Sequence, residues 1–446
     1  MMWGFRFERR QVGIALLGMA ALIPPSQGVG QQPLKQEIGK IIVTPGSGPS
    51  LAVADFAPRT ERAESAAATI SQVLFDDLTF AAVAHVVGRS LYPNQKPADP
   101  SQVDFARWSS DPTRADYLVF GNVAADPQEL IVEAYLYDVP ARTKILSVQH
   151  RGSRDQARRI AHRVADEIVK ALTGRPGIAT SQIAFVSGSG RRSEIYLMDY
   201  DGASIRPLTQ EGSLALLPAW SPDGQKIAYV SFATGVPNIR IRSVRDGSLI
   251  PFPHFSQGTT LSPVFSPDGR WIAFCSSKDS NSTQLYVASS DGKTIRQLTD
   301  EPSVIHSSPR WNPRTGREIA FISNRSGTPQ IYVIDADGTN LRRLLDRGGS
   351  ADSPAWSPDG RYIAFAWRPP EAATFDIFLL DVATREILQL TDGVGNNESP
   401  TWSPDGRHLA FQSDRTGRSE IYIMHIDGTG IKQITTSGGR LPAWSP

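Results

Sequence analysis

The residue types that commonly perform catalysis are spread through this sequence without the spacings that bring a nucleophile and a base together. The sequence contains no Gly-x-Ser-x-Gly turn, no His-Glu-x-x-His pair, no phosphate-binding glycine-rich loop and no Cys-x-x-Cys pair. The seven histidines fall in separate predicted elements, at His85, His150, His162, His254, His306, His408 and His425. We therefore predict a protein with no catalytic residues and no cofactor.

Asp-Gly pairs are the next candidates for chemistry, because carboxylates can bind calcium. Asp335-Ala-Asp-Gly338 is the closest match to a calcium loop, but it lacks the further acidic ligands that such a loop supplies. Asp-Gly is also the pair that most often closes a tight β-hairpin. We interpret these pairs as hairpin turns, with a calcium- or small-ligand-binding protein as an alternative, and predict no metal site.

Length and charge limit the class of protein further. A chain of 446 residues exceeds what one hydrophobic core usually serves, so at least two domains are expected. The formal net charge of +1 provides no basic field for nucleic acid or an anionic membrane. The 37 glycines and 33 prolines are interspersed with apolar runs, which indicates many tight turns between short strands.

The N-terminus has the pattern of a cleaved secretory signal. Arg6, Arg9 and Arg10 precede a twelve-residue apolar run, Val12 to Ile23, which is too short to span a bilayer as a membrane anchor. We predict a signal peptide over residues 1–30. The one cysteine, Cys275, lies in an apolar strand and is predicted to be a buried core residue.

The second half of the chain is a repeat built on Pro-x-Trp-Ser-Pro-Asp-Gly. The leading prolines are separated by 45, 46, 45, 46 and 42 residues, and a period of this size predicts the blades of a β-propeller. They stand at Pro218, Pro263, Pro309, Pro354, Pro400 and Pro442. Each copy predicts four strands, which we call A to D from the Pro-x-Trp segment onward.

Strand counting predicts how the ring closes. A B strand at Ile183–Val186 precedes the first A strand, and an A strand is left over at Trp444. Residues 440–446 should therefore complete the first blade, which removes an exposed sheet edge. We predict a six-bladed propeller over residues 176–446, in which the aromatic residue of each copy packs between blades.

Strand direction then predicts which face binds. The A–B and C–D turns are short and alike and share one face, whereas the D–A connections share the other face and vary in length. Variable loops on a rigid scaffold are where binding residues concentrate. These loops span residues 211–217, 255–262, 300–308, 347–353, 393–399 and 437–441.

Residues 31–175 predict a separate α/β domain. Strands are expected at 39–43, at Leu51–Phe56, at 116–123, at 129–137 and at 144–148, with a helix over 61–80. A last helix should begin at a capping box formed by Ser153 and Gln156 and end at Gly174.

Several segments, taken in their order along the chain, resemble the TolB family. They are Ala165–Gly174, the linker 173–180, Ile183–Val186, the Ser-Pro-Asp-Gly blades and the terminal Pro-Ala-Trp-Ser-Pro. The resemblance implies a monomeric periplasmic, non-catalytic component of the Tol-Pal system that supports envelope integrity and constriction during cell division. A second alternative, the propeller of a prolyl-oligopeptidase-like peptidase, would also need a hydrolase domain after the blades, for which no motif was found.

The resemblance also implies partners and the residues that bind them. The peptidoglycan-associated lipoprotein Pal would bind at the mouth of the propeller, and TolA would bind the segment after the signal peptide. Other outer-membrane lipoproteins or porins are further candidates, whereas nucleic acid and membrane insertion are not expected. The residues expected to bind Pal are Thr259, Thr260, His306, Ser307, Asp352, Asn397 and Glu398, and those expected to bind TolA are Gln32, Leu34, Ile38, Ile41 and Val43.

Overall fold

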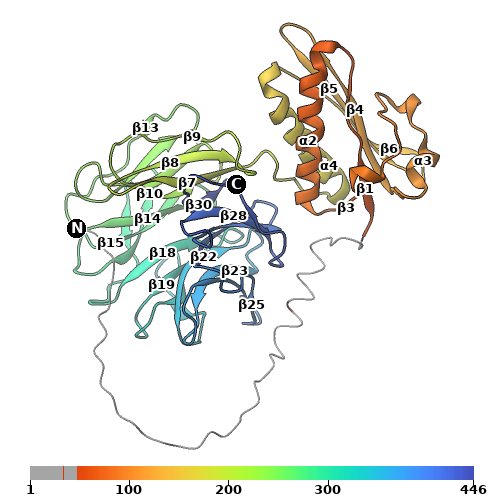
Figure 1. Ribbon diagram of the computed structural model, residues 1–446. Coiled ribbons are helices and arrows are strands. Elements are labelled where there is room, and N and C mark those ends of the chain that lie inside the picture. Colours follow the sequence, from red (N-terminus) through yellow and green to blue (C-terminus); the bar gives the residue numbers. More distant parts are fainter. Residues whose placement is uncertain (1–33, 35–47) are drawn as a thin grey trace, which may run out of the picture.

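The computed structural model of the protein describes Leu34 and residues 48–446. The predicted signal peptide, the predicted strand at 39–43 and all of the predicted TolA-binding residues except Leu34 lie outside the described residues. The described part forms an N-terminal α/β domain beside a β-propeller (Figure 1). None of its helices combines the length and the apolar character needed to cross a membrane.

The N-terminal domain is a sheet with two helices on one face. The strand order is β3-β1-β4-β5-β6, in which β1 pairs in parallel with β3 and β4, while β4, β5 and β6 form an antiparallel meander. The bounds are β1 (Ser50–Val53), β2 (Ala57–Pro58), α2 (Glu64–Ala81), β3 (His85–Val86), α3 (Phe105–Ser109), β4 (Tyr117–Ala125), β5 (Leu130–Asp138), β6 (Thr143–Gly152) and α4 (Ala157–Thr173).

Helix α4 follows the predicted pattern except at its start. Ile160, Val164 and Ile168 are buried, and Gly174 ends the helix in the left-handed conformation with φ of 73°. The capping-box prediction is wrong, because neither Ser153 nor Gln156 makes a side-chain capping hydrogen bond. A 3-10 turn, η4 (Arg154–Gln156), stands between Ser153 and the helix, so the serine hydroxyl does not cap the first turn of α4.

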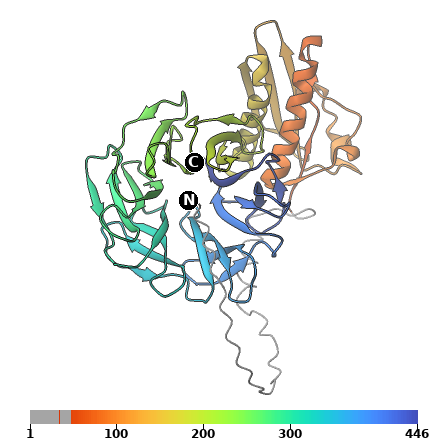
Figure 2. The same cartoon turned by 60° about the vertical axis from the view of Figure 1, so that its left-hand side comes forward.

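The propeller has six four-stranded blades arranged around a central axis (Figure 2). Each blade after the first is a consecutive run of strands paired A-B-C-D, as the repeat predicts. Blade two is β10 (Ala215–Trp220), β11 (Lys226–Ser231), β12 (Asn238–Ser243) and β13 (Leu249–Ile250); blade three is β14 (Thr260–Phe265), β15 (Trp271–Ser276), β16 (Gln284–Ser289) and β17 (Ile295–Gln297). Blade four is β18 (His306–Trp311), β19 (Glu318–Ser323), β20 (Gln330–Asp335) and β21 (Arg342–Arg343). Blade five is β22 (Ser350–Trp356), β23 (Tyr362–Arg368), β24 (Asp376–Asp381) and β25 (Ile387–Gln389); blade six is β26 (Asn397–Trp402), β27 (His408–Ser413), β28 (Glu420–His425) and β29 (Lys432–Gln433).

The first blade is closed by the C-terminal strand, as strand counting predicted. Its order is β30-β7-β8-β9, where β30 (Arg440–Trp444) joins β7 (Gln182–Ser189), β8 (Arg192–Asp199) and β9 (Arg206–Pro207). Trp444 pairs with Ile183, and its indole Nε1 donates to Ser181 Oγ at 2.7 Å. The two ends of the propeller are therefore joined within one sheet.

Each A strand contains a bulge just before its proline, which sequence reasoning missed. The residue preceding the proline adopts a positive φ of 50° to 56° in all six blades, and the A–B pairing shifts register there in every blade. These residues are Leu217, Ser262, Ser308, Ser353, Ser399 and Leu441. The bulges line a central space of about 40 Å³, which is far smaller than a small-molecule site of about 300 to 1,000 Å³.

The C-terminal end of α2 docks onto blade six. The carbonyl oxygen of Phe80 accepts hydrogen bonds from Nε2 of His408 at 2.9 Å and from Nε2 of His425 at 3.1 Å. Arg407 donates to the carbonyl oxygen of Ala82 at 2.8 Å. Helix C-termini carry partial negative charge, so basic donors satisfy both the unpaired carbonyls and the helix dipole.

A buried polar cluster joins the helices to blade one. Asp77 of α2 accepts hydrogen bonds from Nδ1 of His162 on α4 and from the hydroxyl of Tyr200, both at 2.7 Å. Asp201, beside Tyr200, pairs with Arg158 of α4. The domain interface is therefore specified by hydrogen bonds as well as by apolar packing.

Removing residues 440–446 should destabilise the propeller. The deletion takes the A strand from blade one and empties the site of Trp444, a side chain that is 6% exposed. Truncating a buried tryptophan costs about 3 to 5 kcal/mol, a large share of a typical domain stability of about 5 to 15 kcal/mol. Calorimetry should show a lower and broader propeller transition, whereas removal of the exposed Pro446 alone should change nothing. An unaltered transition in the seven-residue deletion would contradict the role assigned to β30.

Candidate protein-binding face of the propeller

The starts of the A strands define one face of the propeller. The D–A loops lead into these strands, and the bulged residues and prolines follow within a few positions. Five of the seven residues expected to bind Pal stand two or three positions before these prolines in blades four to six, and Thr260 and Thr259 precede Pro263 of blade three by three and four positions. The repeat therefore allows the expected residues to be compared position by position.

The residues three positions before the proline are buried. Thr260, His306 and Asn397 are each at most 1% exposed and pair with a buried serine at the end of strand B, at Ser276, Ser323 and Ser413. Their shared register explains why all three are inside. These side chains support the loops from below instead of lying on the surface of the face.

The contacts of Asn397 and His306 show how this layer is built. Asn397 donates to Asp376 at 2.9 Å and accepts from Nη2 of Arg415 at 2.8 Å. The ring of His306 packs edge-on against Phe321, with ring centres 5.2 Å apart, and neither ring nitrogen has a hydrogen-bond partner. Burial and the charge of Arg325 lower the pKa of His306 to about 4, so the imidazole is neutral at pH 7.

The residues two positions before the proline reach the surface. Ser307 and Glu398 are half-buried and Asp352 is exposed. Ser308 and the backbone amide of Ser353 donate to the Asp352 carboxylate, and Gln412 donates to Glu398 at 3.0 Å. Burial raises the pKa of Glu398, and the neighbouring charges of Asp352 and Asp414 add to the effect. Blades five and six therefore give this face an acidic region.

A pocket of about 220 Å³ opens beside this acidic region, between blades four and five. Ile305, Ile322 and Phe375 form its apolar lining, and Ser307 and Asp352 also border it. Ile305 is 49% exposed, which is unusual for so large an apolar side chain next to a buried strand. Ile305 and Phe375 were not among the residues predicted from the sequence. The position of Ile305, immediately before the buried first residue of strand A, could have indicated an apolar side chain on this face.

Thr259 lies at the edge of the same face in blade three. Its backbone amide donates to Ser277 Oγ at 3.0 Å, and its side chain is half-buried. Of the seven expected residues, Thr259, Ser307, Asp352 and Glu398 are thus accessible, while Thr260, His306 and Asn397 form the layer beneath them.

The Asp-Gly turns on the opposite face are closed by their own side chains. In the turn at Asp335–Gly338, Asp337 accepts from the amide and hydroxyl of Thr339, and Asn340 donates to Asp335. Among the described residues, one group of carboxylates and imidazoles is close enough to share a metal, and it is Asp77, His162 and Asp201 at the domain interface. These side chains already bond to one another or to Arg158.

Comparison with known proteins agrees with this architecture. Residues 169–374 and 344–446 match the family described as the TolB beta propeller domain, and residues 40–145 match the TolB amino-terminal domain. The Tol-Pal system protein TolB of Anaeromyxobacter dehalogenans strain 2CP-C is 36% identical over 68% of this chain and 67% of its own length. That of Ruegeria sp. strain TM1040 is 32% identical over 53% of this chain and 54% of its own. The crystal structure of TolB from Acinetobacter baumannii is similar with a TM-score of 0.77 and 27% identity, covering 90% of this chain and 98% of that one.

The buried His306 should make stability depend on pH. Its pKa in the folded state is about 4, below the value of about 6.5 expected when unfolded, so the unfolded state takes up a proton first as pH falls. Stability should therefore drop between pH 6.5 and pH 4, by about 2 kcal/mol from pH 7 to pH 5 for this residue.

Urea unfolding of His306→Asn at the two pH values measures this contribution. The variant should lose that part of the pH dependence, whereas His254→Asn, at an exposed loop residue, should keep it. Equal pH dependence in the wild type and in His306→Asn would contradict the assignment.

Proposed function

The chain belongs to the TolB family, and we propose that it acts in the periplasm as a non-catalytic, protein-binding component of the Tol-Pal system. In this proposal the face formed by the D–A loops binds Pal, and the segment after the signal peptide binds TolA. The single observation that carries it is the combination of the family relationship with an exposed apolar pocket on that face.

The chemistry of the face suits a protein partner better than a small substrate. Its pocket of about 220 Å³ is small and lies next to an acidic region at Asp352 and Glu398. This combination favours a partner segment in which an apolar side chain is followed by basic or amide hydrogen-bond donors. The central space of about 40 Å³ leaves no room for a substrate. The described residues that line the two spaces include no histidine or cysteine, so no serine–histidine or cysteine–histidine pair lies there.

Leu34 supports a link between the two binding regions. Its side chain is 2% exposed and belongs to one apolar cluster with Ala82, after helix α2, and with Tyr362 and Phe411 of blades five and six. A partner that takes Leu34 must first remove it from this cluster, which costs the burial of a leucine, about 1.5 to 3 kcal/mol. If one partner changes the domain interface and thereby the affinity for the second partner, the second partner must change the affinity for the first by the same factor.

Ile305→Asp should weaken Pal binding. A charge in place of an exposed isoleucine removes the apolar lining of the pocket and adds to the acidic region, and losing a central apolar contact costs about 2 kcal/mol or about thirtyfold in affinity. Isothermal titration calorimetry with purified Pal measures the effect. Ile205→Asp is the matched control, because Ile205 is 52% exposed but lies after a C–D turn on the opposite face. Equal losses in both variants would count against this face as the Pal site.

Deleting residues 31–46 should abolish TolA binding and leave Pal binding within about threefold, since the D–A loops are untouched. The same calorimetric titrations with TolA and with Pal measure both affinities. In the intact protein, saturating Pal should change the TolA affinity, because the coupling is reciprocal. Loss of binding to both partners in the deletion would contradict the separate binding regions proposed for TolA and Pal. An unchanged TolA affinity at saturating Pal would contradict the coupling between them.

A further inference from the structure

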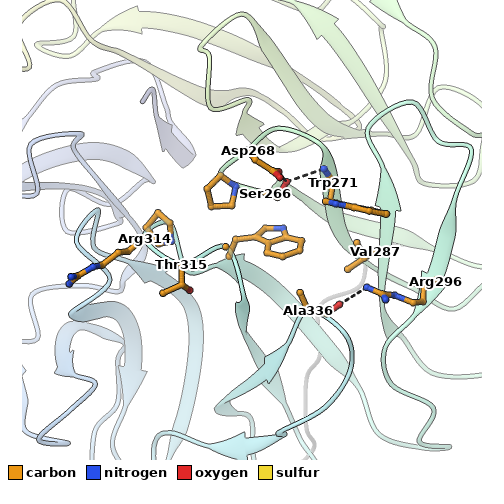
Figure 3. A pocket seen from close by; sticks show the side chains of 12 residues that line it. Ser266, Asp268, Trp271, Val287, Arg296, Arg314, Thr315 and Ala336 are labelled. Atoms are coloured by element: carbon orange, nitrogen blue, oxygen red, sulfur yellow. Dashed lines mark hydrogen bonds between the residues drawn. The ribbon is translucent and has the colours of Figure 1, made fainter.

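A second slot lies between blades three and four, on the face opposite to the D–A loops. It has a volume of about 400 Å³ and is bordered by the A–B turns of both blades. The indoles of Trp271 and Trp311 and the side chain of Val287 form its apolar wall. Figure 3 shows Trp271 and Val287 together with Arg296 and Arg314 around the slot. The slot is independent of the Pal and TolA regions proposed above.

The six-fold repeat provides an internal reference for this slot, because every blade has the same scaffold requirements. The A–B turn of blade four departs from that reference. Asp223, Asp268, Asp359 and Asp405 accept a hydrogen bond from the serine of their own turn, whereas this turn reads Asn-Pro-Arg-Thr-Gly. Asn312 Oδ1 closes the turn instead, by accepting from the amides at 314 and 315. An exposed Arg314 thus stands where the repeat places an aspartate.

The aromatic wall departs from the repeat as well. Trp271 is the first residue of strand B, a register occupied in the other blades by Gln182, Lys226, Glu318, Tyr362 and His408. The indoles of Trp220 and Trp402 each donate to a backbone oxygen of the preceding blade at 2.9 Å, whereas Nε1 of Trp311, like that of Trp356 in blade five, has no acceptor. Trp271 and Arg314 are the two departures that meet at this slot, and Trp271 also packs against the apolar core of blades three and four.

The charge around the slot is positive. Asp268 forms a salt bridge with Arg270 at 2.7 Å, and the hydrogen bond that it accepts from Ser266 lowers its pKa to about 2. Arg296 donates to the carbonyl oxygen of Ala336 (Figure 3). Besides the hydrogen bonds from Thr339, its charge also lowers the pKa of Asp337, but it forms no direct salt bridge among the described residues. Together with Arg314 it leaves a cationic border next to two indoles.

We propose that this slot binds an extended peptide segment of a partner protein, in which a proline or aliphatic side chain is followed by a carboxylate. Aromatic-lined slots of this size take the apolar side chains of extended, proline-containing segments, whose ordering costs little conformational entropy. The arginine border selects the acidic neighbour and disfavours a basic one. Arg314 replaces the carboxylate that the repeat would have presented to such a ligand.

Indole N–H signals in ¹⁵N-labelled full-length protein give a direct test, since Trp271→Phe and Trp311→Phe assign two of the nine tryptophans. The probe is acetyl-Glu-Leu-Pro-Pro-Glu-amide, and it should shift the signals of Trp271 and Trp311 in a saturable way. Arg314→Asp, which restores the acidic residue of the repeat at an exposed position, should weaken this binding at least tenfold. Trp271→Lys, which installs the residue of blade two, should do the same.

Three controls separate the slot from unspecific binding. Lys226→Ala, at the Trp271 register of blade two, should bind the acidic peptide like the wild type. Acetyl-Lys-Leu-Pro-Pro-Lys-amide and chitotetraose should leave both indole signals in place. Absence of binding by the acidic peptide, equal binding by Arg314→Asp, or a preference for the basic peptide or the sugar would overturn the proposal. Because Arg314 is exposed and distant from the D–A loops, Pal affinity should be unchanged in that variant, so failure here leaves the Tol-Pal assignment standing.

Discussion

The pairing of β30 with β7 is the constraint on which the rest of the molecule depends. The two strands are separated by almost the whole propeller sequence, yet they lie in one sheet, and Trp444 and Ser445 bond to Ser181 and Gln182 beside the interdomain linker. A propeller left open at this point would expose the backbone of β7 as a sheet edge. Closure therefore sets the curvature of the ring, and with it the spacing of the loops on both faces.

The N-terminal domain is attached at the same part of the ring. The end of α2 docks on Arg407, His408 and His425 of blade six, while Asp77 and α4 contact Tyr200 and Asp201 of blade one. The closing strand lies between these two contacts in the order of the blades. The domain thus spans the point at which the ring joins, and the cluster that contains Leu34 connects it to blades five and six.

Comparing equivalent positions of the six copies distinguishes residues that support the propeller from residues that reach its surface more clearly than burial alone does. Residues three positions before each proline are buried in a shared register, and those two positions before it reach the surface, so His306 and Ser307 differ in role although they are neighbours. Aligning the six copies on their prolines would have predicted this difference. The same comparison isolates Trp271 and Arg314 as departures from the repeat.

The sequence by itself determined the fold class, the six blades, the closing strand and the family, because turn residues, strand alternation and a fixed period are local properties that survive in one dimension. It also predicted a binding face on the D–A loops. Only the tertiary structure decided that Thr260, His306 and Asn397 lie beneath that face, that Ile305 and Phe375 form a pocket with Asp352, and that α4 begins without its capping box. The first two outcomes depend on which blades become neighbours and on the bulge in each A strand, where a positive φ reverses the side-chain alternation that the sequence pattern assumes. The third depends on the 3-10 turn that precedes α4.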